Sequence, residues 1–119
     1  MDRDLLWLGS TLEDLREASE DVRETMGIAL RVAQNGGKSD DAKPMHGVLR
    51  EVTEISTQDE SGAYRLMYAA RLGSSIFVLD FFQKKSKSGI STPKADLDRI
   101  EARLKQARQL AAELEKQHG

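Results

Sequence analysis

The chain has 119 residues and a net charge of −2; 39% of its residues are hydrophobic and 32% are charged, which predicts one globular domain over residues 1–119. It contains no cysteine, which excludes disulfides, thiolate metal sites and cysteine nucleophiles. No window approaches the ~20 apolar residues of a membrane span, and the apolar run at residues 5–8 is too short for a signal peptide, so we expect a cytoplasmic protein with no membrane partner.

The first third of the chain predicts one strand and two helices. Residues 5–9 form a short apolar run that ends in glycine, as an opening strand would. Residues 10–13 match a capping box, in which Ser10 and Glu13 satisfy free amides of a short helix. A second helix is expected after Ser19, with a stripe of apolar residues at helical spacing: Val22, Met26, Ala29, Leu30 and Ala33. Asn35-Gly36-Gly37 predicts its end.

Three strands are predicted after a polar loop that reaches about Gly47. They cover residues 48–57, 64–71 and 76–82, and the last run is apolar enough to be a central strand covered on both faces. Gly73-Ser74 fits a two-residue type II′ turn between the last two strands. Leu72 then pairs with Ser75, paired residue numbers sum to 147, and Arg65 lies opposite Phe82.

This register assigns side chains to the two faces of the sheet. One face carries Arg65, Arg71, Asp80, Phe82 and Lys84. The other face, which we expect to be the helix-packed core, carries Tyr64, Leu66, Tyr68, Phe77, Leu79 and Phe81. A three-residue loop would shift the pairing by one residue and change this assignment.

A long C-terminal helix is predicted to begin with Thr92 as N-cap and Pro93 as its first residue. Its apolar residues recur at spacings of 3 and 4: Leu97, Ile100, Leu104, Ala107, Ala111 and Leu114. This seam suits either a partner helix or the protein's own sheet. The predicted fold class is α+β: a compact sandwich with N-terminal helices, a mainly antiparallel sheet and this long C-terminal helix.

Basic residues concentrate in the middle of the chain. Residues 1–42 hold 5 Lys/Arg against 10 Asp/Glu (−5), residues 43–94 hold 8 against 5 (+3), and residues 95–119 hold 5 against 5. An anionic ligand is therefore expected in the middle segment. The alternative is ordinary variation of surface charge.

Arg65, Lys84 and Lys85 are the candidate catalytic residues. A guanidinium in mid-strand can grip two phosphate oxygens and stabilise a pentacovalent phosphorus, although Arg65 would equally suit an ion pair with Asp80. Adjacent lysines on a strand point to opposite faces, and the register puts Lys84 on the Arg65 face. A lysine near other cations has a lowered pKa, which suits acid/base work; the alternative is a solvated run of lysines. Lys87 and Lys94 extend the basic patch and are expected to hold backbone phosphates.

Two further residues are candidates for acid/base or orienting roles. Asp80 interrupts an apolar run, so its carboxylate requires a partner or a raised pKa; structural pairing is the favoured reading. His46 lies in a loop, where an imidazole can exchange protons near neutral pH, although a lone histidine is a weak signal. No spacing of ligand type indicates a metal site, and no cofactor is expected.

Several segments carry a family resemblance. They are Leu8-Gly9-Ser10 with residues 12–16, Ala42-Lys43-Pro44-Met45 with Gly47, the strand Tyr64-Arg65-Leu66-Met67-Tyr68, and above all residues 78–90 through Thr92-Pro93-Lys94. Together they resemble a bacterial RelE/HigB-type toxin, in the phage-derived branch of the RelE/ParE superfamily.

The resemblance implies the toxin of a type II toxin–antitoxin pair, whose partner is a helix-turn-helix antitoxin. Such toxins cleave mRNA in the ribosomal decoding site without a metal: the ribose 2′-OH attacks the adjacent phosphate. By position, Arg65 would stabilise the phosphate, Lys84 or Lys85 would supply acid/base or charge stabilisation, and Lys43 and Arg71 would grip RNA.

Two departures from the family pattern bear on this expectation. Many members have histidine at the position of Asp80, and many are distinctly basic, which predicts weak binding of this chain to RNA outside the ribosome. Two other functions remain open: a non-enzymatic toxin of the same fold that binds a protein target such as DNA gyrase, and a domesticated phage protein that only pairs with a regulator.

Overall fold

The fold is that of a computed structural model, in which residues 2–84 and 92–118 are described. The elements follow in the order β1 (Leu5–Trp7), α1 (Thr11–Arg16), α2 (Glu20–Gln34), β2 (Ala42–Pro44), a 3-10 turn η1 (Gly47–Leu49), β3 (Val52–Asp59), β4 (Gly62–Ala69), β5 (Ile76–Lys84) and α3 (Lys94–His118). The strands form one sheet in the order β1-β5-β4-β3-β2. β1 and β5 are parallel and the other neighbours are antiparallel. The predicted α+β class is confirmed.

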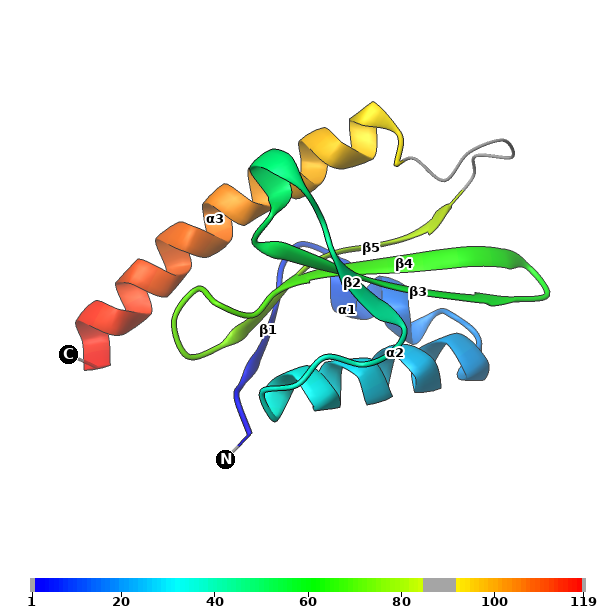
Figure 1. The fold of residues 1–119 in the computed structure, drawn as a ribbon, viewed down its shortest axis with the longest axis horizontal. Coiled ribbons are helices and arrows are strands. Elements are labelled where there is room, and N and C mark those ends of the chain that lie inside the picture. The colour runs from blue at the N-terminus through cyan, green and yellow to red at the C-terminus, as the bar shows by residue number, and fades with distance from the viewer. Residues whose placement is uncertain (1, 85–91, 119) are drawn as a thin grey trace.

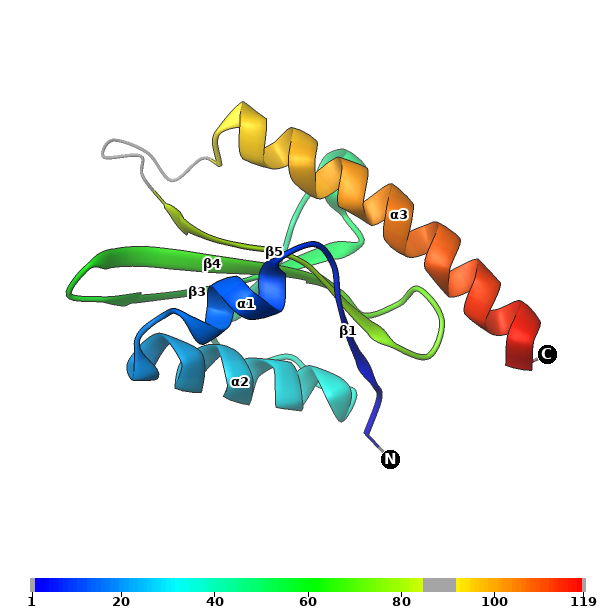
Figure 2. The same cartoon turned by 180° about the vertical axis from the view of Figure 1, so that it is seen from behind.

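Helices cover both faces of the sheet. Figures 1 and 2 show α1 and α2 on one side and α3 crossing the other side. The α2 face buries its predicted apolar stripe against Ile55, Leu66, Tyr68, Val78 and Phe81. The α3 face buries Ile100, Leu104, Ala107 and Ala111 against Val52, Met67, Phe77 and Leu79. The seam of the last helix therefore packs on the protein's own sheet, and β5 is covered on both faces as predicted.

Several element boundaries differ from the predicted ones. The predicted polar loop contains β2, because Ala42 is buried and pairs with Ile55 on β3. Residues 47–49 form the 3-10 turn η1, so β3 begins only at Val52. At the start of α1, the Ser10 hydroxyl donates to Asp14 at 2.8 Å and makes no capping bond, so the predicted capping box is wrong.

The β4–β5 hairpin has the predicted register at its open end and a different one near its turn. Arg65 pairs with Phe82 and Met67 with Asp80 as predicted, but Tyr68 pairs with Val78, so the pairing skips Leu79 in a β-bulge. Residues 70–75 connect the strands, so the predicted two-residue turn is wrong. Because of the bulge, Phe77 and Leu79 lie on the α3 face, whereas they were predicted to share the face of Leu66, Tyr68 and Phe81.

One carboxylate ties the β3–β4 turn to the start of α2. Asp59 accepts hydrogen bonds from the Ser19 hydroxyl at 2.6 Å and from the backbone N–H and hydroxyl of Ser61 at 2.8 and 2.6 Å. Ser19 is the predicted N-cap and accepts the Val22 N–H at 3.3 Å. The bond from Ser19, followed by those from Ser61, holds the pKa of Asp59 below its ordinary value of 3.8.

We expect Asp59→Asn to destabilise the protein at neutral pH but not at low pH. A carboxyl whose pKa is lower in the folded state stabilises the fold above its unfolded pKa, and this contribution is lost as the pH falls through the folded pKa. The melting temperatures of the variant and the wild type should therefore differ at pH 7 and converge below pH 3.8. An equal difference at both pH values would show that the charge of Asp59 is not what stabilises the turn.

Candidate active site

Arg65 lies in the middle of β4, and a carboxylate on the neighbouring strand fixes its guanidinium. Ser56 pairs with Arg65, so Glu54, two residues away on β3, projects from the same face. Arg65 Nη1 donates to Glu54 Oε2 at 2.9 Å and to Thr92 Oγ1 at 3.0 Å. The two charged side chains are only 12% and 4% exposed. They form a largely buried ion pair, which restricts the arginine to one orientation.

Arg65 borders a cleft of about 400 Å³ between β2, the sheet and the start of α3. The cleft is lined by Lys43, Pro44, Met45, His46, Glu54, Arg65, Thr92 and Leu97. The structure thus brings two exposed candidate residues, Lys43 and His46, to the same cleft as Arg65. Two permanent cations against one carboxylate leave the described lining positively charged, which suits an anionic ligand.

Lys84 lies on the same face of the sheet as Arg65. It is the last residue of β5 and pairs with Ala63, two residues from the Arg65–Phe82 pair. Side chains two residues apart project to the same face, so Lys84 follows Phe82 and Arg65 about 7 Å further along the strand. It is half-buried and is not among the residues that line the cleft. Lys85 and Lys87 lie outside the described residues, and their roles stay predictions.

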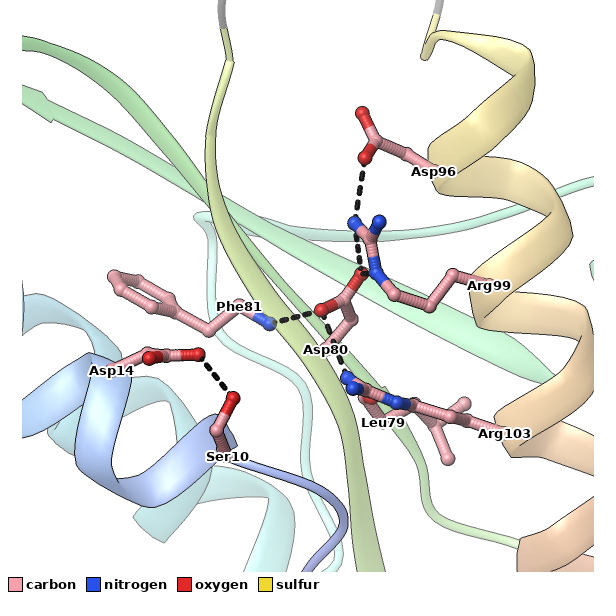
Figure 3. A network of polar contacts seen from close by, with 8 residues as sticks. All are labelled: Ser10, Asp14, Leu79, Asp80, Phe81, Asp96, Arg99 and Arg103. Carbon is pink, nitrogen blue, oxygen red and sulfur yellow. Dashed lines mark hydrogen bonds and ion pairs between the residues drawn. The ribbon is translucent and has the colours of Figure 1, made fainter.

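Asp80 is buried and pairs with two arginines of α3. Figure 3 shows its carboxylate facing Arg99 and Arg103, with the backbone of Phe81 on the other side. Arg99 Nε donates to Asp80 Oδ2 at 2.8 Å, and Arg103 Nη1 donates to Oδ1 at 3.1 Å. The favoured interpretation of Asp80, structural pairing, agrees with this geometry. The expected partner, Arg65, is wrong, because Arg65 pairs with Glu54 and not with Asp80.

The Asp80 network also binds backbone groups beside the β-bulge. Arg103 Nη1 also donates to the Leu79 carbonyl at 2.9 Å, and Asp80 Oδ1 accepts the Phe81 N–H at 3.0 Å. Gly9 makes room for the arginine: its φ is +58°, and a Cβ there would lie 2.6 Å from Arg103 Nη2. The network therefore stabilises both the bulge and the position of α3 on the sheet.

Arg99 extends this network along the same face toward Phe82. Its guanidinium also donates to Asp96 at 2.6 Å and lies 5.7 Å from the centre of the Phe82 ring, the residue that pairs with Arg65. Hydrogen bonding to Asp80, more than to Asp96, raises the pKa of Arg99. Arg99 therefore remains a fixed cation behind Phe82.

Two predicted RNA contacts lie elsewhere. Arg71 follows the end of β4 and lines two other clefts together with Lys38, so it does not share the Arg65 cleft as the predicted hairpin implied. Lys94 begins α3, one residue later than the predicted helix start, and forms an exposed pair with Asp98 at 3.1 Å. The side chain of Thr92, the predicted N-cap, accepts the hydrogen bond from Arg65.

Sequence reasoning missed Glu54, Arg99 and Arg103. Glu54 shares one face of β3 with Val52 and Ser56, so the alternation indicates a charged residue on a covered face. Arg99 and Arg103 are four residues apart and next to the buried Ile100 and Leu104, which places them on the inner side of α3. The sequence contains these signals but does not show which carboxylate each arginine meets.

The match to a known family covers most of these residues. The family model of the phage derived protein Gp49-like (DUF891) family matches residues 13–105. The chain belongs to this family. Gp49-like proteins are RelE/ParE-like toxins associated with toxin–antitoxin systems, and this family implies an antitoxin partner. No curated protein matches the chain.

The Gp49-like match includes all of β2 to β5 and the arginines of α3 that hold Asp80.

Within residues 2–84 and 92–118, no helix is long and apolar enough to cross a membrane. Within the same residues, no group of three or more His, Asp or Glu side chains is gathered as metal ligands would be.

Proposed function

We propose that this Gp49-like toxin is a HigB-type endoribonuclease that cleaves mRNA in the ribosomal decoding site and so inhibits translation. The observation that carries the proposal is the buried guanidinium of Arg65 at a cleft that it shares with Lys43 and His46. A surface that only binds another protein does not require an arginine held in one orientation beside a histidine.

The proposed reaction needs no metal and no cofactor. The ribose 2′-oxygen attacks the adjacent phosphorus, the bond from phosphorus to the 5′-oxygen breaks, and the products are a 2′,3′-cyclic phosphate and a 5′-OH. His46 lines the cleft and is the proposed general base that takes the 2′-OH proton. Lys84 or Lys85 returns a proton to the leaving 5′-oxygen or stabilises its charge.

Arg65 supplies the electrostatic part of catalysis. The attacked phosphate gains negative charge as it becomes pentacovalent, and a donor that is already oriented stabilises this charge without reorganising. Glu54 and Thr92 provide that orientation. In this proposal Lys43, which lines the same cleft, holds the neighbouring phosphate.

We further propose that residues 1–119 act as a single toxin domain in the cytoplasm and that the antitoxin has a helix-turn-helix fold. The toxin–antitoxin association of the family supports an antitoxin. The helix-turn-helix fold and the ribosomal target rest on the sequence resemblance alone.

Primer extension in a translating extract tests the function. We expect new mRNA ends when the toxin is added, with 5′-OH termini that a polynucleotide kinase labels without prior dephosphorylation. Naked mRNA at the same toxin concentration should stay largely intact, because the net charge of −2 gives weak binding to free RNA. Intact mRNA in both reactions would refute the proposal, and inhibited DNA supercoiling alongside it would support a gyrase inhibitor.

A further inference from the structure

A second cleft of about 390 Å³ gathers basic side chains at the other end of the sheet. Its charged lining residues are Arg3, Lys38 and Arg71, and none of its described lining residues is acidic. Tyr68 also borders it, and burial raises the pKa of its phenol, so this side chain adds no negative charge. Three cations without a lining carboxylate make the cleft attractive to an anion.

The cations of this cleft differ from several other arginines of the protein. Arg65, Arg99, Arg103 and Arg108 each form an ion pair with an Asp or Glu. Among the described residues, Arg3, Lys38 and Arg71 have no such carboxylate partner. Their charge is therefore available to a ligand.

The backbone holds these three residues in place. Arg3 exchanges hydrogen bonds with the end of α2: its N–H donates to the Gln34 carbonyl, and its own carbonyl accepts from Gln34 Nε2. Its guanidinium donates to the carbonyl of Ala70, next to Arg71. Lys38 follows Gly36, whose φ of +91° turns the chain out of α2. The cleft thus joins the N-terminal segment, the α2 exit and the β4 exit.

Beside the short edge strand β2, a further cleft shares lining residues with both this cleft and the Arg65 cleft. A third cleft of about 240 Å³ shares Lys38 and Arg71 with the second cleft and Pro44 with the Arg65 cleft. It adds Arg50, and its one carboxylate, Glu51, pairs with Arg108. From Arg65 to Ala70 the chain advances about 17 Å at ~3.3 Å per residue, so a single phosphate cannot contact both ends.

We infer that the Arg3–Lys38–Arg71 cleft binds backbone phosphates of the same RNA strand whose scissile phosphate lies at Arg65. The inference rests on the proposed function and names the path of its substrate: a single strand that crosses the β2 edge. Only a ligand with several phosphates in a row can use both clefts at once. The cleft positions the strand and takes no part in the chemistry.

Salt-dependent binding of a non-cleavable RNA tests this path. The probe is a fluorescent single-stranded 12-mer with 2′-O-methyl riboses, which lack the attacking hydroxyl. Each phosphate contact contributes about 0.7 to the slope of log K against log salt for a single strand. We expect the Lys38→Ala/Arg71→Ala double variant to lower the slope by about 1.4 and to weaken binding roughly tenfold at low salt.

Controls separate this inference from the nuclease. Lys105→Ala/Lys116→Ala removes two exposed cations of α3 that line none of these clefts and should leave both slope and affinity unchanged. Lys38 and Arg71 are exposed, and circular dichroism should show an unchanged fold for both double variants.

An unchanged slope and affinity in Lys38→Ala/Arg71→Ala would overturn the inference, even if the wild type cleaves mRNA. A lowered slope would support the path, even if the wild type leaves mRNA intact in the extract. Loss of antitoxin binding without loss of RNA binding would instead assign the cleft to the antitoxin and overturn the RNA path.

Discussion

Arg65→Ala is expected to reduce mRNA cleavage by about 10²- to 10³-fold, the usual effect of removing one oriented donor from a developing anion. The rate should be measured by primer extension in the translating extract, at equal concentrations of folded protein. The cleavage rate of Arg65→Lys should fall between those of the wild type and of Arg65→Ala, because an ammonium keeps the charge but loses the planar pair of donors. Asp98→Ala, which removes an exposed carboxylate on α3, serves as a matched surface control.

The same substitution also destabilises the protein, and this effect has to be separated from catalysis. Glu54 is only 4% exposed, so Arg65→Ala leaves a buried carboxylate without its arginine, at a cost of about 3 kcal/mol. Adding Glu54→Gln removes that charge and should restore much of the lost stability. If the Arg65→Ala/Glu54→Gln protein is folded and cleaves mRNA at the wild-type rate, Arg65 is not the catalytic donor.

Asp80→Ala should lower the free energy of unfolding by about 3 kcal/mol, measured by urea denaturation. Removing one member of a buried ionic network costs ~3–5 kcal/mol; the lower end applies because Arg99 and Arg103 are 37% and 22% exposed and keep part of their hydration. The substitution also removes the acceptor of the Phe81 N–H beside the bulge.

A graded series identifies the cause of that loss. Asp80→Asn keeps the shape and one acceptor, so its effect should be intermediate. Arg99→Ala should cost less than Asp80→Ala, because Arg103 still pairs with the carboxylate. Asp98→Ala breaks only an exposed pair and should stay within about 0.5 kcal/mol of the wild type. Equal losses for Asp80→Ala and Asp98→Ala would contradict a structural role for the network.

The fold class and the α2 stripe were predictable because they depend on local patterns. Apolar spacing in α2 determines its buried face, and the alternation in β4 determines which of its residues share a face with Arg65. The turn itself was predicted wrongly, and the bulge at Leu79 compensates for the change of register near it. Phe77 and Leu79 were therefore assigned to the wrong face, whereas Arg65 and Lys84 were not.

The partners of the charged residues were not predictable. Two carboxylates of the sheet, Glu54 and Asp80, are candidate partners of Arg65. Arg65 pairs with Glu54 because α3 brings Arg99 and Arg103 to Asp80. These contacts join segments up to 24 residues apart, such as Leu79 and Arg103. The second basic cleft likewise joins Arg3 to Arg71, and no local pattern connects them.

The strand order has a consequence for synthesis of the protein. β5 is the last of the described strands to be translated, yet it lies between β1 and β4 and also supports α3. A nascent chain that ends before Ile76 leaves β1 without its neighbour, and its apolar residues stay exposed until β5 emerges. A prematurely terminated product therefore lacks a complete sheet, and we expect the native fold to form only after β5 has been translated.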